Sequence, residues 1–439
     1  MKESHEITCI NCPIGCRVTV ETENGEAVSV SGNQCRRGDV YARQECVRPM
    51  RTLTAVIPCE GSGTPLSVRT TEPIPRDRIG ECMDLLSRVK VKAPVRMGDV
   101  ILSHVLGTDA DVIATRNLKE ETEMSGKLAP IRMHPAYRHG KDTPWGGDRL
   151  KKVFGKDIPD DRTGESLEVS AIPSLNSTDD GGRPLGELIA LYGERLTGNK
   201  VSGDFPLLLK LLDARDRLSV QVHPDDDYAA RVGNKFGKTE AWVILDCDEG
   251  AELVYGVLPG TTREQLKEAS LGGDAVEALL GRVKVHPGEV YYIPAGTVHA
   301  IGAGCLIYEI QQSSDVTYRF YDWNRTDAQG RRRELHIDKA IDVVDLSIRQ
   351  ESAAPRPIGE GRELLLKEKY FTLERWTNAR AALPAEPGYF RLLTALEKTR
   401  IEWDGGSLDL DRGTTALLPA DDFDLMIDAG KLLLAYPTV

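Results

Sequence analysis

The sequence predicts a mainly β protein whose larger C-terminal part follows a small, cysteine-rich α+β domain. Apolar and polar residues alternate at 218–223, which is the period of a half-buried strand, and 238–245 and 288–293 indicate further strands. Seven of the nine cysteines fall in the first 82 residues. In a reducing compartment such a cluster is more typical of metal binding or redox chemistry than of disulfides.

We expect four segments, namely a Cys-rich domain at 1–117, a linker at 118–127, a β domain at 128–350 and a second β half at 351–439. The linker is polar, charged and without period. The sequence Thr262-Arg263-Glu264-Gln265 is a capping-box signature. It predicts a small helical insert, which we expect over the mouth of the site. Gly413-x5-Pro419 repeats part of the 288–294 pattern and indicates a degenerate second half.

Charge and composition exclude some classes of protein. The formal net charge of −12 argues against a sequence-independent nucleic-acid binder, which needs cations for phosphate contacts. There is no apolar run near 18 residues, and the start MKESHEIT has no basic region followed by an apolar one. We therefore expect no membrane span, no signal peptide and a cytoplasmic location.

Several polar residues of the β domain fall on shared strand faces. Alternation places Ser219, Gln221 and His223 on one face of the first strand, and Lys238 and Glu240 on one face of the next. A Pro-Ala-Gly turn then presents His299 at its end. Imidazole and carboxylate groups in this pattern predict a metal site at His223, Glu240 and His299, although a single buried histidine is more often a hydrogen-bonded core residue.

The motifs in this region resemble those of a known family. Gly288-x5-Pro-x-Gly-x2-His299 matches the second motif of the cupin barrels. Together with QVHPDD, GKTEAW, PAGTVHAIG and YEIQQSSDVTYRFYDWNR, roughly residues 128–439 resemble type I phosphomannose isomerase in its short bacterial form. The resemblance implies a cupin-type double-stranded β-helix barrel in two halves. It also implies one catalytic zinc ion, with mannose 6-phosphate and fructose 6-phosphate as substrates.

The resemblance also implies roles for single residues. Gln221 joins His223, Glu240 and His299 as a metal ligand, Arg319 is catalytic, and Ser219 and Lys238 contact the substrate phosphate. The general base stays open between Glu309 and Lys238. Gln221 could instead bond only to backbone, Arg319 could form a structural ion pair, and Ser219 or Lys238 could be solvated. Alternation also predicts that Thr317, Arg319 and Tyr321 share one face.

The N-terminal cysteines predict a second centre. Cys9, Cys12 and Cys16 form a C-x2-C-x3-C loop, and a hairpin at Asn24-Gly25 folds Cys35 back toward them. This resembles the cluster loop of molybdopterin oxidoreductases and, over 1–117, an uncharacterised Cys-rich domain family. A 4Fe-4S cluster with an unknown redox partner, a second zinc ion and no metal all stay open. The remaining cysteines of this region are expected to be core thiols, namely Cys46, Cys59 and Cys82.

Two other functions remain for the β domain. A different cupin chemistry, such as an iron oxygenase, would use a fuller histidine set, whereas Gln221 occupies the place of one histidine here. A non-catalytic sugar-binding regulator could keep the fold, but it would not need Arg319 and a metal together. The sequence leaves open why the two parts are fused.

Overall fold

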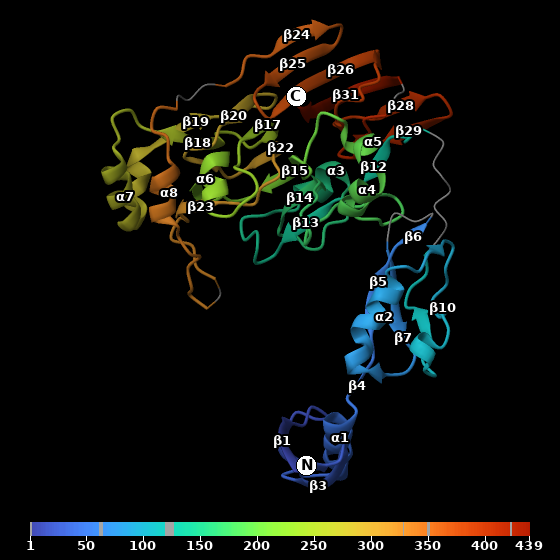
Figure 1. Cartoon of the computed structure of the whole chain (residues 1–439). Coiled ribbons are helices and arrows are strands. Elements are labelled where there is room, and N and C mark those ends of the chain that lie inside the picture. The colour runs from blue at the N-terminus through green and yellow to red at the C-terminus, as the bar shows by residue number, and fades with distance from the viewer. Residues whose placement is uncertain (1, 61–64, 119–126, 328, 349–351, 422–423) are drawn as a thin grey trace. The chain divides into compact units, whose positions relative to one another are not determined.

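The computed structural model describes the chain except residues 1, 61–64, 119–126, 328, 349–351 and 422–423 (Figure 1). The chain divides into two compact units, Met1–Ser125 and Gly126–Val439. The linker expected at 118–127 lies almost wholly outside the described residues, as does the expected boundary between 350 and 351, so both remain predictions. No helix in the described part of the chain has the length and apolar character needed to cross a membrane.

The N-terminal unit begins with three antiparallel strands, β1 (Lys2–Thr8), β2 (Arg17–Glu23) and β3 (Glu26–Ser31), followed by helix α1 (Arg36–Val47). The β2–β3 turn has Asn24 at φ 51° and Gly25 at φ 82°. Positive φ at both central residues is the requirement of a type I′ turn, so the predicted hairpin is confirmed.

A second core of this unit contains a four-stranded sheet and a helix. Its members are, in spatial order, β10 (Val100–Leu102), β11 (Val112–Ala114), β7 (Leu66–Thr70) and β5 (Thr54–Ile57), with α2 (Ile79–Leu86). Cys59 and Cys82 are buried in this core, as expected for core thiols. Cys46, on α1, is half-buried and packs against a separate small core that contains Val18 and Val20 of β2 and Ala42 of α1.

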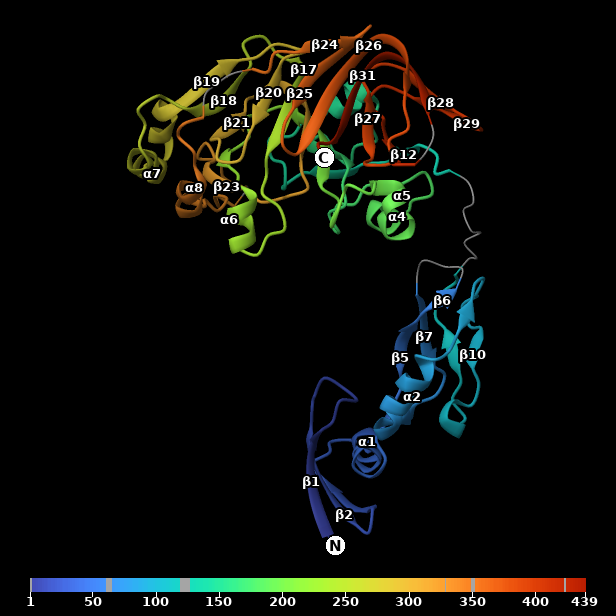
Figure 2. The same cartoon turned by 45° about the horizontal axis from the view of Figure 1, so that its top comes forward.

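The C-terminal unit contains two sheets that enclose a shared core (Figure 2). The first has six strands, in the order β13 (Ala136–His139), β14 (Thr163–Val169), β15 (Leu207–Ala214), β22 (Cys305–Gln312), β17 (Glu240–Cys247) and β20 (Val290–Ile293). The second has five, in the order β19 (Leu280–Lys284), β18 (Glu252–Val257), β21 (His299–Ile301), β16 (Val220–Val222) and β23 (Tyr318–Tyr321).

A third sheet forms the C-terminal half. Its nine strands are β12 (Ile131–Met133), β30 (Thr415–Leu418), β27 (Arg391–Ala395), β31 (Leu425–Pro437), β26 (Phe371–Leu383), β25 (Arg362–Lys367), β24 (Arg356–Gly359), β28 (Thr399–Trp403) and β29 (Gly406–Leu410). One apolar core joins it to the six-stranded sheet. That sheet is therefore covered on both faces, which explains why β15 reads as a nearly continuous apolar run.

The helical insert forms as predicted, but its position was predicted wrongly. Helix α7 (Arg263–Leu271) begins with the capping box of Thr262 and Gln265. Its Leu266 packs with Val220 and Val222 of β16, which alternate with Gln221 and point to the opposite face. The insert, together with α8 (Ile337–Val343), therefore covers the outer face of the five-stranded sheet rather than the mouth of the site.

The close approach of Gly198 to Gly388 yields a stability prediction. Gly198 has φ +97°, and a Cβ there would lie 2.2 Å from the Gly388 carbonyl oxygen. Gly203 has φ +81° with open space around it. We expect Gly203→Ala to lose about 1–2 kcal/mol through backbone strain alone, and Gly198→Ala to lose clearly more, measured from urea unfolding midpoints. Equal losses would contradict a tight contact at Gly388.

Candidate active site

Strand pairing brings the predicted site residues together. Gln221 on β16 is directly opposite His299 on β21 and opposite Arg319 on β23. Residues directly opposite each other on antiparallel strands share a face. The face of the five-stranded sheet that looks toward the six-stranded sheet therefore carries these three side chains, and Glu240 enters from the start of β17.

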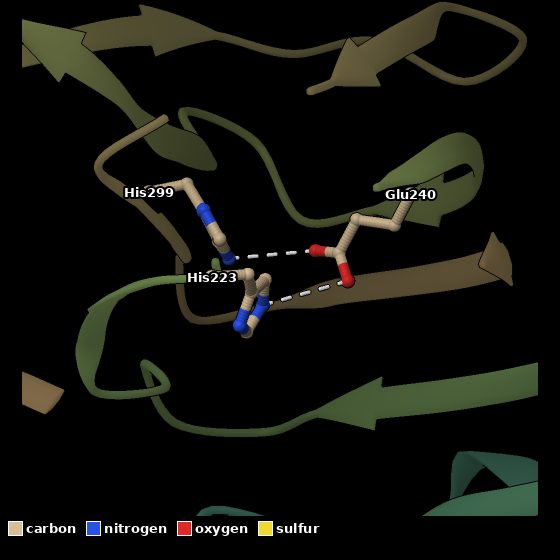
Figure 3. A group of neighbouring side chains, drawn as sticks. All are labelled: His223, Glu240 and His299. Atoms are coloured by element: carbon tan, nitrogen blue, oxygen red, sulfur yellow. Dashed lines mark ion pairs between the residues drawn. The ribbon is translucent and has the colours of Figure 1, made fainter. Parts of the chain in front are cut away.

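Three buried side chains form a compact group, which Figure 3 shows. The ligand atoms of His223, Glu240 and His299 all lie within 4.8 Å of one another. Glu240 Oε2 is 3.6 Å from His223 Nε2, and Glu240 Oε1 is 3.4 Å from His299 Nε2. All three residues are at most 1% exposed.

Backbone carbonyls orient both imidazoles. Nδ1 of His223 donates to the Val316 carbonyl at 2.9 Å, and Nδ1 of His299 donates to the Thr297 carbonyl at 2.8 Å. Each Nε2 then carries a lone pair that faces Glu240, since one imidazole nitrogen is the donor and the other the acceptor. Burial lowers the pKa of both rings, to about 3 for His299, so both stay in the neutral form that binds metals.

The Glu240 carboxyl fits a bound cation. Burial raises its pKa to about 7, because an ionised carboxylate is costly away from water. Glu240 Oε1 and His299 Nε2 are buried and have no hydrogen-bond partner within the described part of the chain, which is costly unless another group binds them. Two neutral imidazoles and one carboxylate are a common donor set for zinc. The residues therefore fit a divalent metal ion.

Lys238 lies directly beside this group. Its Nζ is 2.9 Å from His223 Nε2 and 2.7 Å from Glu240 Oε2. The ammonium thus contacts two of the three ligand atoms and compensates the buried carboxylate. Because a metal ion would repel it, Lys238 is expected to turn toward the adjoining cavity, which it also lines.

A cavity of about 470 Å³ adjoins the group, and Gln221, Lys238 and Glu309 line it. Glu309 is buried, with Oε1 3.1 Å from Lys210 Nζ and Oε2 accepting from Trp242 Nε1 at 3.0 Å. Burial opposes its ionisation, but the ammonium groups of Lys210 and Lys238 outweigh burial and lower the pKa of Glu309. Glu309 is therefore a carboxylate at neutral pH.

Arg319 and Ser219 lie together on the wall of the same cavity. Arg319 Nε donates to Ser219 Oγ at 3.2 Å, and another of its nitrogens donates to the Glu334 carbonyl at 2.8 Å. Burial lowers the pKa of Arg319, and the nearby Arg333 guanidinium lowers it further. Both partners of Arg319 are neutral, so its charge is available to an anionic ligand.

The prediction that Tyr321 shares the face of Thr317 and Arg319 is wrong. Thr317 and Arg319 line the cavity, whereas Tyr321 packs in the core beneath α7 and α8. The pairing of β16 with β23 shifts between Val220 and Gln221. This irregularity turns Tyr321 to the opposite face, which strict alternation does not anticipate.

Sequence reasoning missed an ion-pair network in the wall of the cavity. Lys210 lies 3.1 Å from Glu309 and 3.5 Å from Glu165, which in turn faces Arg138. Arg138 also pairs with Asp315. The sequence does contain one sign of this network. Lys210 lies within a largely apolar strand, and a lysine is almost never buried without a partner.

The structure brings two of the four predicted N-terminal ligands, Cys9 and Cys35, close to the same residue, Gly38. The Cys9 N–H donates to the Cys16 carbonyl at 2.8 Å and closes the loop, while Cys35 caps α1. A Cβ on Gly38 would lie 3.7 Å from Cys9 Sγ and 3.9 Å from Cys35 Sγ. Among the described cysteines, however, no three sulfurs lie within 4.8 Å of one another. The Gly38 backbone N–H lowers the pKa of the exposed Cys35.

Two family models match the chain. Residues 132–242 match "Phosphomannose isomerase type I, catalytic domain". Residues 36–116 match a family described as "Protein of unknown function (DUF1667)". This match begins after Cys35, so all four cysteines of the predicted centre precede it, namely Cys9, Cys12, Cys16 and Cys35.

The relatives agree with the first match. A mannose-6-phosphate isomerase of Streptococcus mutans is 46% identical over 53% of this chain and 74% of its own. A probable mannose-6-phosphate isomerase of Bacillus subtilis, GmuF, is 36% identical over 70% of this chain and 99% of its own. A crystal structure of the Bacillus subtilis mannose 6-phosphate isomerase aligns with a TM-score of 0.65 at 34% identity, over 70% of this chain and 99% of that one. The chain therefore belongs to the type I phosphomannose isomerase family.

Proposed function

We propose that the C-terminal unit interconverts mannose 6-phosphate and fructose 6-phosphate with a zinc ion bound by His223, Glu240 and His299. The observation that carries this proposal is the buried two-imidazole, one-carboxylate group beside a cation-rich cavity. Isomerisation moves one proton between C1 and C2 of the sugar and passes through an enediol. The reaction therefore needs a base, a group that tolerates negative charge and a means of orienting two oxygens.

The residues around the buried group suit a catalytic zinc site rather than a structural one. Three protein ligands with further open positions are typical of catalytic zinc. Gln221, opposite His299 and facing the cavity, is proposed as a fourth, weaker ligand. A divalent ion there would polarise the sugar oxygens at C1 and C2.

Glu309 is the proposed general base. It lines the cavity and is ionised at neutral pH because Lys210 and Lys238 lower its pKa, so it can accept a proton. Trp242 and Lys210 hold one carboxylate oxygen each, which fixes its orientation. Lys238, once displaced from the ligand atoms, can donate a hydrogen bond to a sugar oxygen.

Arg319 is proposed to stabilise the enediolate. Its guanidinium stays charged at neutral pH, and its partners are a hydroxyl and a backbone carbonyl. A preorganised donor of this kind stabilises charge that develops in the transition state.

A coupled assay on the full-length protein tests the function. We expect turnover of both phosphosugars in the presence of zinc, its loss after chelation and its recovery when zinc is restored. Dioxygen consumption and sugar binding, measured beside turnover, separate the alternatives. An oxygenase would consume dioxygen, and a sugar-binding regulator would bind without turnover. Absence of turnover by the zinc-loaded protein would overturn the proposal.

Substitutions should separate metal binding from catalysis. We expect His299→Ala and Glu240→Gln to lose metal and activity together. Arg319→Ala and Glu309→Gln should keep the metal and lower kcat by roughly 10²–10³-fold, since each removes an interaction used in the transition state. Metal analysis beside steady-state kinetics decides this, and loss of zinc from the Arg319 variant would show a structural role instead.

We further propose that Cys9, Cys12, Cys16 and Cys35 bind a 4Fe-4S cluster. The supporting observation is that the Cys9 and Cys35 sulfurs lie on the same side of Gly38, 3.7 and 3.9 Å from the position that a Cβ would take there. Sulfurs around one tetrahedral zinc ion lie roughly 3.8 Å apart, given Zn–S bonds of about 2.3 Å. The described thiols are spread more widely than that, which favours a larger centre. Isomerisation involves no net electron transfer, so such a centre would be structural or would serve a separate redox partner.

Anaerobic purification of the full-length protein tests the cluster. We expect broad visible absorption with iron and sulfide, lost in Cys12→Ser but kept in Cys46→Ser, because Cys46 lies outside the C-x2-C-x3-C loop and is not one of the four proposed ligands. Isomerase turnover should be equal in both variants. If the purified protein contains zinc and no iron at these cysteines, the centre is a structural zinc site and not a cluster. A folded protein without metal at these cysteines would contradict any metal centre there.

A further inference from the structure

The cavity beside the metal group carries an excess of positive charge. The chain has a formal net charge of −12, yet six cationic and four acidic side chains line this cavity. The cations are Arg138, Lys141, Lys210, Lys238, Arg319 and Arg333, and the acids are Asp142, Glu165, Glu309 and Asp315. A local excess of cations in a net-acidic protein suits an anionic ligand.

Four of these cations already have acidic partners. The pairs are Arg138 with Asp315, Lys210 with Glu309, Lys238 with Glu240, and Arg333 with Asp322. The Arg333–Asp322 pair is bidentate, with nitrogen–oxygen distances of 2.6 and 2.7 Å. Such pairs hold their side chains in place and offset their charge. As far as the described residues go, Arg319 and Lys141 are the cavity cations without an acidic partner, so their charge is free for a ligand.

Lys141 differs from Arg319 in its position. Arg319 is half-buried and held by Ser219 and a backbone carbonyl near the metal group. Lys141 follows β13 in an exposed turn, and no carboxylate of the described residues lies within 4.0 Å of its ammonium. It lines both the active-site cavity and a second cavity of about 640 Å³, which share Lys141, Asp142 and Arg333. Lys141 therefore lies at the boundary between the two cavities.

We infer that Lys141 binds the phosphate group of the substrate. The inference rests on the proposed function, which places the C1 and C2 oxygens at the metal group and leaves the phosphate for a cation farther along the cavity. A lysine ammonium is a compact partner for phosphate. Lys238, predicted from the sequence for this role, lies beside the metal-binding atoms, where the sugar oxygens rather than the phosphate are proposed to bind. Lys141 is thus a specificity-determining residue for a phosphorylated sugar.

Kinetics of matched variants test the inference. Lys141→Gln should raise KM for mannose 6-phosphate by about 10- to 100-fold, the range of a lost charge-assisted hydrogen bond, and change kcat little. Inorganic phosphate is expected to compete with the substrate for this position, and its inhibition constant should rise in parallel. Lys141→Arg should restore most of the affinity. Lys151→Gln removes the same charge from an exposed residue outside the cavity and should leave KM unchanged.

Calorimetry with inorganic phosphate separates this inference from the proposed function. Weaker phosphate binding by Lys141→Gln than by wild type and Lys151→Gln supports the inference, whether or not the protein turns over phosphosugars. Equal phosphate affinity and equal KM in Lys141→Gln and wild type would overturn it and leave the isomerase proposal standing. A fall in kcat without a rise in KM would also overturn it, because Lys141 would then act in the chemical step.

Discussion

The burial of one carboxylate between two backbone-anchored imidazoles is the constraint on which the site depends. Glu240 is fully buried, and burial raises its pKa to about 7 although the adjacent Lys238 ammonium lowers it. The Val316 and Thr297 carbonyls fix His223 and His299 so that both Nε2 atoms face that carboxylate. A cation satisfies all three groups at once, whereas an apolar core would have excluded them.

The two sheets of the C-terminal unit make this burial possible. The five-stranded sheet carries His299 on β21 and places His223 directly after β16, and the six-stranded sheet carries Glu240 and Glu309. The six-stranded sheet is in turn covered by the nine-stranded sheet of the C-terminal half. That half therefore excludes water from the rear of the site, which strengthens electrostatic interactions inside it. Its role in the fold is to provide a dry, rigid wall.

Sequence patterns predicted the parts governed by local chemistry. The Asn24-Gly25 turn and the Thr262 capping box form as expected because a few neighbouring residues determine them. Patterns failed where tertiary pairing decides. A register shift between β16 and β23 turned Tyr321 away from the cavity. Packing of Leu266 of α7 with Val220 and Val222 placed the helical insert on the outer face of the five-stranded sheet. The partners of Lys210 come from strands distant in sequence, so no local pattern could name them.

Anomalous diffraction at the zinc edge, from crystals of the full-length protein loaded with zinc, shows whether His223, Glu240 and His299 bind the metal ion. We expect one peak in the C-terminal unit, about 2.0–2.1 Å from Nε2 of His223 and of His299 and about 2.0–2.2 Å from a Glu240 carboxylate oxygen. The Lys238 ammonium should then lie away from those atoms. A peak bound through either Nδ1, or a site that leaves Glu240 without a metal, would contradict this ligand set.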